Sequence, residues 1–384
     1  MSTKNVLVTG ATGHIGSRLV IKLLENNYKV TALIRKESEV SKYLEYIGAS
    51  MHICNLNKEE TFIKLLKSDT VVFHLAAENS TETNQREKTI ENTYGLTKSF
   101  ISVCLKANVK KIIYTSSVVV LGRSKNKENL IDLNDKEKNM EIPYVAGKIL
   151  AEDWISGVNK QNSDIRIIYP SWVIGQGYNH PTPPHIFLNS LIYKKNFFCI
   201  EGGISLAHVD DVASGHIKVL ENGKKNGRYI FSGHNISFKE LYNQINKRFN
   251  KKEKFITLPT KPLKILCKLM GKYSPIEYNY AKNIIGNYSW YKSSNAIKIG
   301  YEIRSLNDMF KDIEIDIQKR SLKLNIFQYL NSSNNFISEN KKTLLITGFP
   351  GWLGNRVVQN LISNENYAKN RPYKKIKLLV QEKF

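Results

Sequence analysis

Tyr144 and Lys148 stand four residues apart in the segment Tyr144-Val145-Ala146-Gly147-Lys148. On a helix this spacing puts both side chains on one face, where the ammonium lies near the phenol and favours its ionised form. A phenol tuned in this way can pass a proton to or from a carbonyl oxygen. The pair therefore predicts acid–base chemistry, and the surrounding elements must hold both groups against a substrate.

A glycine-rich turn near the start of the chain predicts the other reactant. The run Thr9-Gly10-Ala11-Thr12-Gly13-His14-Ile15-Gly16 follows the apolar segment Val6-Leu7-Val8 and opens an apolar helix pattern. Gly10 allows a tight turn, Gly13 lets the backbone approach a pyrophosphate, and Gly16 lets the helix pack close to the strand. The helix N-terminus attracts the phosphates of a dinucleotide, whose nicotinamide would exchange a hydride while Tyr144 moves the proton. The cofactor-binding residues expected here are Gly10, Thr12, Gly13, His14, Ile15 and Gly16.

Strand-like and helix-like patterns alternate through the first part of the chain. Apolar strand-like runs recur at residues 29–34, 50–53, 70–74, 111–114 and 165–169. This alternation predicts an α/β fold with a Rossmann-type, doubly wound parallel sheet, whose ligands lie at the carboxyl ends of the strands. Ser117 ends the run Tyr114-Thr115-Ser116-Ser117, and Asn92 lies upstream within Glu91-Asn92-Thr93-Tyr94-Gly95.

Taken together, these motifs resemble one protein superfamily. Residues 4 to about 320 are similar to an extended short-chain dehydrogenase/reductase, through the glycine turn, Ser117, the Tyr-x-x-x-Lys pair and His208-Val209-Asp210-Asp211-Val212-Ala213. Within this superfamily of NAD-dependent epimerases and dehydratases, the chain most resembles the dihydroflavonol-4-reductase-like branch, which includes the hopanoid-associated sugar epimerases. The segments that carry the finer resemblance are Pro170-Ser171-Trp172-Val173-Ile174-Gly175, Pro181-Thr182-Pro183-Pro184 and Gly227-Arg228-Tyr229-Ile230.

The resemblance implies a role for each candidate catalytic residue. Tyr144 would be the general acid/base, Lys148 would hold the nicotinamide ribose and lower the pKa of Tyr144, and Ser117 would hydrogen-bond the reacting oxygen. Asn92 would anchor Lys148 through a water. Ser116 is an alternative to Ser117, and Asn92 could instead cap a helix.

The end of the second strand-like run bears on which dinucleotide binds. A ribose 2′-hydroxyl calls for Asp or Glu there, but the chain has Arg35 and Lys36, two cations suited to a 2′-phosphate. NADP(H) is therefore favoured over NAD(H). NAD(H) stays an alternative, because Lys and Arg are abundant throughout the chain and their presence at this position carries less weight. Asn55 stands where the family usually has Asp, and it can still accept a hydrogen bond from adenine. His74 is expected to be a packed residue rather than a catalyst. The resemblance adds these cofactor-binding residues: Leu56, Ala76, Ala77, Tyr144, Lys148, Pro170 and Val173.

The composition argues against several other classes of function. The 384 residues include 57 Lys and Arg against 34 Asp and Glu, a net charge of +23. The basic residues are spread along the chain without a nucleic-acid-binding signature, so we expect no nucleic-acid partner. The sequence contains no apolar run of membrane-spanning length and no signal peptide, which predicts a cytoplasmic protein without stable membrane insertion. The four cysteines lack metal-ligand spacing and should be ordinary thiols, with no metal.

Substrate specificity is expected to reside in the later, smaller α+β part, about residues 171–320, which follows a cofactor part of about residues 1–170. The stretch Pro262 to Gly271 could touch a membrane or a lipid tail, but a core helix is the commoner explanation. A small-molecule substrate is expected, and a homodimer is compatible with these residues. Candidate pocket residues, each more often packing than contact when taken singly, are Trp172, Tyr178, His180, His185 and Phe187.

The glycine fingerprint returns near the end of the chain. Thr347-Gly348-Phe349-Pro350-Gly351-Trp352-Leu353-Gly354 follows Leu344-Leu345-Ile346, and another strand-like run covers residues 376–380. We expect residues 1–324 to be one domain, residues 325–342 a polar linker, and residues 343–384 the truncated start of a second dinucleotide-binding β-α-β unit. A lone unit of this kind cannot bury both faces of its sheet, so a gene fragment is expected, and an appendage folded on the first domain is the alternative.

Three functions are compatible with these residues. The leading expectation is an NADP(H)-dependent oxidoreductase that acts on a carbonyl or secondary alcohol of a small molecule. A nucleotide-sugar epimerase or dehydratase with tightly bound NAD is the alternative among enzymes. An idle dinucleotide-sensing scaffold is the alternative outside them, and the intact set of Ser117, Tyr144 and Lys148 argues against it.

Overall fold

The computed structural model describes residues 4–77, 85–158, 163–176, 182–193, 198–252, 254–270 and 282–316, and the backbone of 342–349 and 373–380. The chain divides into two units, Met1–Met309 and Phe310–Phe384, which are described separately.

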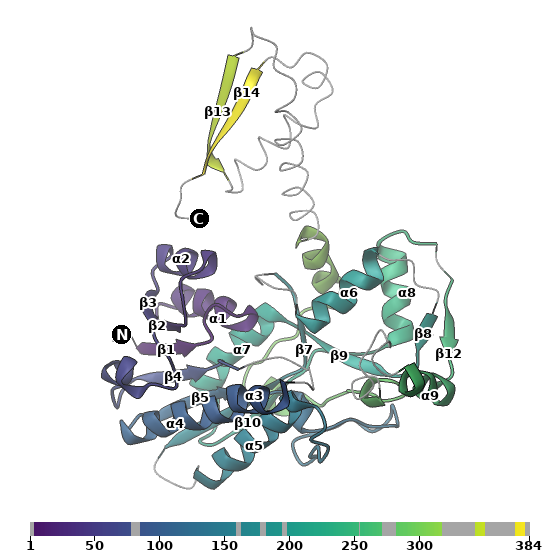
Figure 1. Ribbon diagram of the computed structural model, residues 1–384, viewed down its shortest axis with the longest axis horizontal. Coiled ribbons are helices and arrows are strands. Elements are labelled where there is room, and N and C mark those ends of the chain that lie inside the picture. The colour runs from purple at the N-terminus through teal and green to yellow at the C-terminus, as the bar shows by residue number, and fades with distance from the viewer. Residues whose placement is uncertain are drawn as a thin grey trace. The chain divides into compact units, whose positions relative to one another are not determined.

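A seven-stranded parallel sheet forms the centre of the first unit (Figure 1), with the strands in the order β10-β6-β5-β4-β1-β2-β3. The order reverses between β1 and β4, as in a doubly wound Rossmann sheet. The predicted fold class is therefore confirmed, and the five predicted runs agree with β2 to β6 to within one residue at either end. The bounds are β1 Asn5–Thr9, β2 Lys29–Ile34, β3 Ser50–Ile53, β4 Val71–His74, β5 Lys111–Thr115, β6 Asp164–Pro170 and β10 Arg228–Phe231.

Helices cover both faces of this sheet because its strands are apolar on both sides. A large cluster of buried apolar side chains lies on each face of the sheet. The neighbouring residues Ile112 and Ile113 of β5 belong to different clusters, as expected when successive side chains of a strand point to opposite faces. One face carries α3 Arg86–Ile90, α4 Leu96–Lys106 and α5 Pro143–Val158, and the other carries α1 His14–Glu25, α2 Glu39–Tyr46 and α7 Val209–Asn222 (Figure 1).

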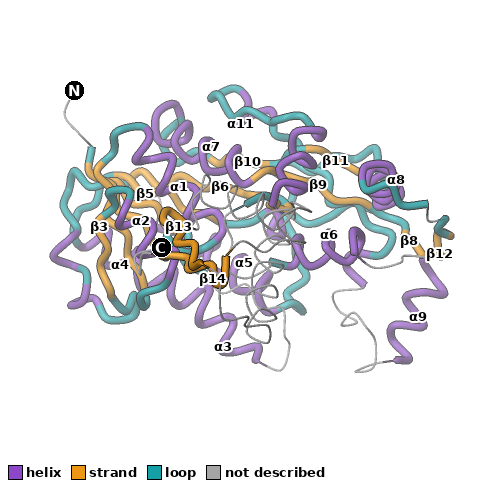
Figure 2. Tube along the Cα trace, turned by 90° about the horizontal axis from the view of Figure 1, so that it is seen from above, coloured by secondary structure: helices purple, strands orange, loops and turns teal. Residues whose placement is uncertain are grey.

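The chain after β6 builds two small sheets beside the carboxyl ends of the main strands. One has the order β11-β9-β7 and the other pairs β12 with β8 in parallel. Figure 2 shows β8 and β12 at the opposite end of this unit from β3. Their bounds, with those of the accompanying helices, are β7 Trp172–Ile174, α6 Pro183–Tyr193, β8 Phe198–Ile200, β9 Gly203–His208, β11 His234–Ser237, α8 Phe238–Arg248, β12 Ile256–Leu258, α9 Thr260–Met270 and α11 Ser294–Ile297.

Helix α9 is not the core helix that the sequence favoured for residues 262–271. Its side chains Ile265, Leu266 and Leu269 are 60%, 52% and 79% exposed, and Cys267 is the buried residue of the helix. On the inner side of α9, Leu263 and Cys267 pack with Ile285 in a small apolar cluster. This cluster covers one face of the helix only. Gly271 lies outside the described residues.

In the second unit, β13 Lys342–Phe349 pairs in parallel with β14 Tyr373–Val380. Two parallel strands are what a β-α-β start requires, and the intervening residues lie outside the described ones. The sequence placed the turn at Gly348, but β13 continues through Phe349, which pairs with Val380 after a shift in register. The assignment of residues 325–342 as a linker and 343–384 as a truncated domain stays a prediction.

Candidate active site

The glycine turn after β1 presents a helix N-terminus that has no side-chain cap among the described residues. Gly10 has a φ of +67°, and a Cβ there would lie 2.8 Å from the backbone nitrogen of Ala76, so only glycine fits. Gly13 is exposed and is the N-cap of α1, without a side-chain cap or an acidic residue in the first turn. A Cβ on Gly13 would contact only Gly10 O, at 3.1 Å. This open, positively polarised turn fits a pyrophosphate.

His14 links the glycine turn to the end of β7. Its Nε2 lies 3.2 Å from Gly175 O, and its ring is 4.7 Å from the ring of His185 on α6. Burial, with the neighbouring His185 charge, lowers the pKa of His14 to about 3. The ring is therefore neutral at physiological pH, and together with the half-buried Thr12 and Ile15 it lines the turn without adding positive charge.

Ser117 and Tyr144 meet beyond the carboxyl end of β5. Ser117 is the N-cap of the short 3₁₀ turn η5 Val118–Val120, and Tyr144 lies in the first turn of α5. Burial raises the pKa of Tyr144, and its side-chain hydrogen bond with Ser117 opposes that effect. Ser116 has a different partner, since its hydroxyl donates to Glu152. Of the two serines, Ser117 is therefore the one that contacts the phenol.

Lys148 is buried and points toward β5. Its Nζ donates to Thr115 O at 2.9 Å and to the hydroxyl of Tyr114 at 3.3 Å. Burial lowers the pKa of Lys148 to about 8, and Glu152 partly offsets this. Burial and the hydrogen bond with Ser117 are the causes that act on the pKa of Tyr144 here. The lowering of that pKa by Lys148, which the resemblance implies, stays a prediction.

Glu152 is a largely buried carboxyl group, with 12% of its side chain exposed, that the sequence motifs did not single out. Its Oε2 accepts a hydrogen bond from the hydroxyl of Tyr169 at 2.8 Å and lies 3.8 Å from Nη2 of Arg228. Burial raises its pKa, whereas Ser116, Tyr169, Arg228 and Lys148 oppose that effect. The signal was present in the spacing: Tyr144, Lys148 and Glu152 recur every four residues and so share one face of α5.

Asn92 lies in a π-helical turn, η4 Glu91–Gly95, that joins α3 to α4. Because helical backbone continues on both sides, Asn92 does not cap a helix, and the capping alternative is wrong. Its neighbour Thr93 packs against α5, where a Cβ added to Gly147 would lie 2.8 Å from Thr93 Cβ. This close approach brings the turn of Asn92 beside the residue that precedes Lys148. Single π-helical turns of this kind are frequent at functional sites.

The residues expected to select the cofactor lie after β2 and β3. Arg35 and Lys36 are exposed at the end of β2. Asn55 is exposed after β3, and its Oδ1 accepts a hydrogen bond from the backbone nitrogen of Asn57 at 3.0 Å, while Leu56 is buried. The two cations therefore lie exposed at the strand end where the sequence expected them, and the amide oxygen of Asn55 accepts a hydrogen bond within its own loop.

The remaining predicted cofactor residues are apolar and lie at the ends of β4 and β6. Ala76 and Ala77 are half-buried after β4, and Pro170 and Val173 are buried around the end of β6. His74 is fully buried between Thr9 and Thr97, with Nδ1 2.8 Å from Thr9 Oγ1. Burial lowers its pKa to about 3. His74 is a packed, neutral residue, as predicted.

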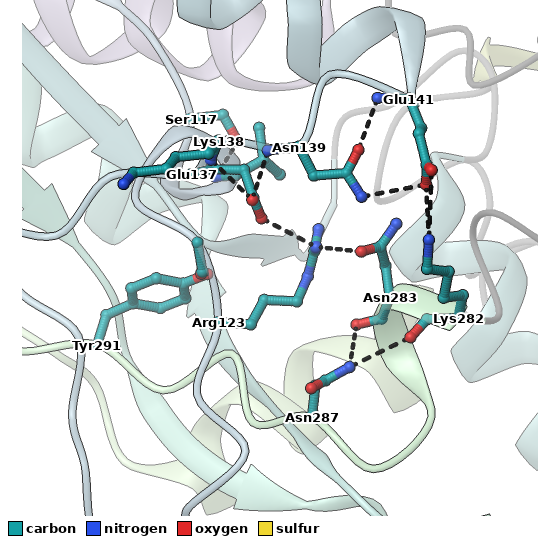
Figure 3. Close-up of polar contacts among 12 residues, drawn as sticks. Ser117, Arg123, Glu137, Lys138, Asn139, Glu141, Lys282, Asn283, Asn287 and Tyr291 are labelled. Atoms are coloured by element: carbon teal, nitrogen blue, oxygen red, sulfur yellow. Dashed lines mark hydrogen bonds and ion pairs between the residues drawn. The ribbon is translucent and has the colours of Figure 1, made fainter. Parts of the chain in front are cut away.

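A polar cavity of about 250 Å³ adjoins the turn that follows Ser117 (Figure 3). Nη1 of Arg123 donates to Glu137 at 3.4 Å and to Asn283 at 3.0 Å. The backbone nitrogen of Glu137 donates to Val120 O at 2.8 Å, which ties this cavity to η5 and so to Ser117. Its two cations and two acids balance in formal charge. The lining residues are Leu121, Gly122, Arg123, Ile131, Asp135, Lys136, Glu137, Asn283 and Asn287.

Several other candidates are half-buried and pack against neighbouring aromatic rings. The ring of Trp172 lies 5.7 Å from that of Phe187, and Phe187 lies 5.7 Å from Phe238. Tyr178 and His180 fall outside the described residues. The four cysteines are free and buried, as expected. In the part of the chain that the structure describes, we find no helix able to cross a bilayer and no grouping of His, Cys, Asp or Glu suited to a metal ion.

Comparison with known proteins decides the family. The model of the NAD dependent epimerase/dehydratase family matches residues 6–231, which hold the glycine turn, Ser117, Tyr144 and Lys148. The chain belongs to this family. It is an NAD(P)-dependent enzyme of the extended short-chain dehydrogenase/reductase type, as its motifs predicted. The family match ends before the second unit, so the predicted start of a second such domain is not confirmed.

Family members similar to this chain include plant reductases. A dihydroflavonol 4-reductase of Gerbera hybrida is 31% identical over 268 residues, covering 62% of this chain and 71% of the relative. A bifunctional dihydroflavonol 4-reductase/flavanone 4-reductase of Malus domestica is 28% identical and covers 80% and 88%. The predicted resemblance to the dihydroflavonol-reductase-like branch is thereby confirmed.

Solved structures agree with the fold. The crystal structure of gox2253 is 26% identical, with a TM-score of 0.69 over 81% of this chain and 96% of that one. A UDP-glucose 4-epimerase from Thermotoga maritima, solved with UDP-glucose, is 18% identical, with a TM-score of 0.65 over 83% of this chain and 99% of the epimerase. At that identity the second likeness supports the shared fold alone.

Proposed function

We propose that this enzyme is an NADP(H)-dependent oxidoreductase that interconverts a carbonyl and a secondary alcohol on a small molecule. The observation that carries the proposal is the contact between Ser117 and Tyr144 at the carboxyl end of β5. Lys148 lies one helical turn beyond Tyr144 on α5. These three groups are what proton transfer to a carbonyl oxygen requires.

Each residue has a distinct task in the proposed reaction. Ser117 holds the reacting oxygen by a hydrogen bond, and Tyr144 gives it a proton during reduction or takes one during oxidation. Burial raises the pKa of Tyr144, so the free enzyme holds the phenol protonated, which is the form that reduction needs. The bound nicotinamide supplies or accepts the hydride. Lys148 would hold its ribose, and Asn92 would anchor Lys148 through a water.

The dinucleotide fits the residues present. The uncapped N-terminus of α1 would hold the pyrophosphate, and the exposed Arg35 and Lys36 would hold a 2′-phosphate through charge-assisted hydrogen bonds. The phosphorylated cofactor, NADPH, is therefore favoured.

The variant Arg35→Asp tests this cofactor preference. Loss of the guanidinium and the added negative charge should weaken the binding of NADPH by about tenfold or more, because a hydrogen bond to a charged group contributes roughly 1.5–3 kcal/mol. NADH should be affected far less. Titration of both cofactors by fluorescence measures the two affinities. Lys29→Asp, at the exposed amino end of the same strand, is the matched control. A wild type that prefers NADH, or an equal loss for both cofactors, overturns the assignment.

The polar cavity favours one second candidate, an epimerase or dehydratase of a polyhydroxylated substrate with tightly bound NAD. Its donors and acceptors, Arg123, Glu137 and Asn283 among them, suit hydroxyl groups better than a flat apolar ring. Mass spectrometry of the nucleotide retained on purification separates the two functions. Retained NAD supports the epimerase, and loosely held NADPH supports the reductase.

A further inference from the structure

The outward side of α9 is an apolar surface, here called the α9 face, formed by Ile265, Leu266, Leu269 and Met270. These side chains are 60%, 52%, 79% and 37% exposed. They lie within one arc of the helix, since positions 265, 266 and 269 are separated by one, three and four residues. Soluble proteins rarely leave so many large apolar groups together on one helix without a use for them.

The neighbouring strands carry two further exposed apolar side chains. Ile200 of β8 packs with Leu263 and Cys267 on the inner side of α9. Side chains two residues apart on a strand share a face, so Phe198 lies on the same face of β8 as Ile200. Phe198 pairs in register with Ile256 of β12, and these two side chains are 57% and 69% exposed. Figures 1 and 2 both show α9 next to β8 and β12.

Lysines flank this apolar surface. Lys261 and Lys268 are exposed on α9, and Lys264 follows the same edge of the helix. Partial burial lowers the pKa of Lys264, with Lys125 and Lys282 adding to the effect, so several cations gather here. The recorded acidic partners nearby are Glu141, which pairs with Lys282 at 3.2 Å, and Glu201, which accepts from Thr260 at 2.6 Å. The first turn of α9 carries no acid.

We propose that the α9 face binds the surface of an anionic lipid bilayer, with α9 lying in the plane of the interface. Exposed apolar side chains enter the boundary between headgroups and acyl chains, and the flanking lysines meet the lipid phosphates. The flanking lysines favour an anionic bilayer over a second copy of this chain, because two α9 faces in contact would bring positive charges together. Such binding is peripheral, and it leaves the bilayer uncrossed.

Flotation with lipid vesicles tests the proposal on the full chain. The wild type should float with vesicles of phosphatidylcholine and phosphatidylglycerol, and this binding should weaken at high salt. It should stay in solution with phosphatidylcholine alone. The double variant Leu266→Glu/Leu269→Glu should lose flotation, while its melting temperature stays the same because both side chains are exposed. Lys261→Gln and Lys268→Gln should each weaken vesicle binding by about fivefold.

The variant Ile297→Glu is the matched control, because Ile297 is an apolar residue of α11 with 53% exposure, away from α9 (Figure 2). It should float like the wild type. No flotation of the wild type, or equal flotation with neutral vesicles, overturns the proposal. So does a wild-type dimer in analytical ultracentrifugation that the double variant converts to a monomer, since a second copy would then cover the α9 face.

Discussion

The buried ammonium of Lys148 shows how a local pattern and a three-dimensional environment can differ. The spacing from Tyr144 sets the helix face on which the lysine lies, but four rotatable bonds decide where the ammonium goes. In the structure it bonds Thr115 O and the hydroxyl of Tyr114, both from β5. Its charge is supported from one turn further along α5, by Glu152. Glu152 is thus a positioning residue for the proposed chemistry.

The variant Glu152→Gln tests this role. The carboxylate raises the pKa of Lys148, which burial has lowered to about 8, so its removal should lower that pKa further. The ammonium is charged below its pKa and loses the proton as the pH rises, so the alkaline fall in kcat/KM should move to lower pH. Asp153→Asn, on the exposed side of the same helix, should leave the profile unchanged. If the alkaline fall in kcat/KM stays at the same pH in Glu152→Gln, Glu152 has a structural role only.

Tyr144→Phe tests the proposed proton donor. The variant keeps the ring that packs beside Ser117 but removes the hydroxyl, so kcat should fall about 100-fold or more, the range of a general acid. Binding of NADPH should change little, because Lys148 bonds Tyr114 rather than Tyr144. Stopped-flow turnover and a fluorescence titration measure the two quantities. Wild-type turnover in this variant would show that another group moves the proton.

At the scale of elements, the contact between α5 and the π-helical turn η4 should matter for both stability and catalysis. A Cβ at position 147 would lie 2.8 Å from Thr93, so Gly147→Ala should cost about 1–3 kcal/mol of unfolding free energy through overpacking. Gly157→Ala is the control on the same helix, since a Cβ there meets nothing within 4 Å. It should be neutral or stabilising by up to about 1 kcal/mol. Urea unfolding compares them, and equal effects would contradict the close packing.

The strands and the catalytic helix could be predicted from the sequence, because both depend on local spacing. The runs 29–34 and 50–53 coincide with β2 and β3, and Tyr144 and Lys148 do share one helix. Two other features depend on contacts that are distant in sequence. The pattern of α9 predicts an apolar helix face, but whether another element covers that face depends on residues outside α9. Similarly, the π-helical turn at Asn92 lies where its neighbour Thr93 packs against Gly147, a contact between residues more than 50 positions apart.

At the scale of the whole molecule, the first unit should be independent of the residues after 325. Both large apolar clusters lie within Met1–Met309. Ending the chain at residue 325 should therefore leave the melting temperature and turnover of the first unit unchanged. Limited proteolysis of the full chain should cut first within residues 331–340, a polar stretch. A truncated protein that fails to fold would show that residues after 325 are an integral part of the domain.

The strand order of the main sheet also dictates the sequence of events during synthesis. β6 remains at an open edge until its neighbour β10 has been made, about 60 residues later. At roughly 5–20 residues per second, the ribosome leaves this edge unpaired for about 3–12 seconds. An unpaired parallel edge is a template for association with other chains. We therefore expect nascent chains that end between residues 171 and 228 to be the aggregation-prone species of this protein, and the ones most in need of a chaperone.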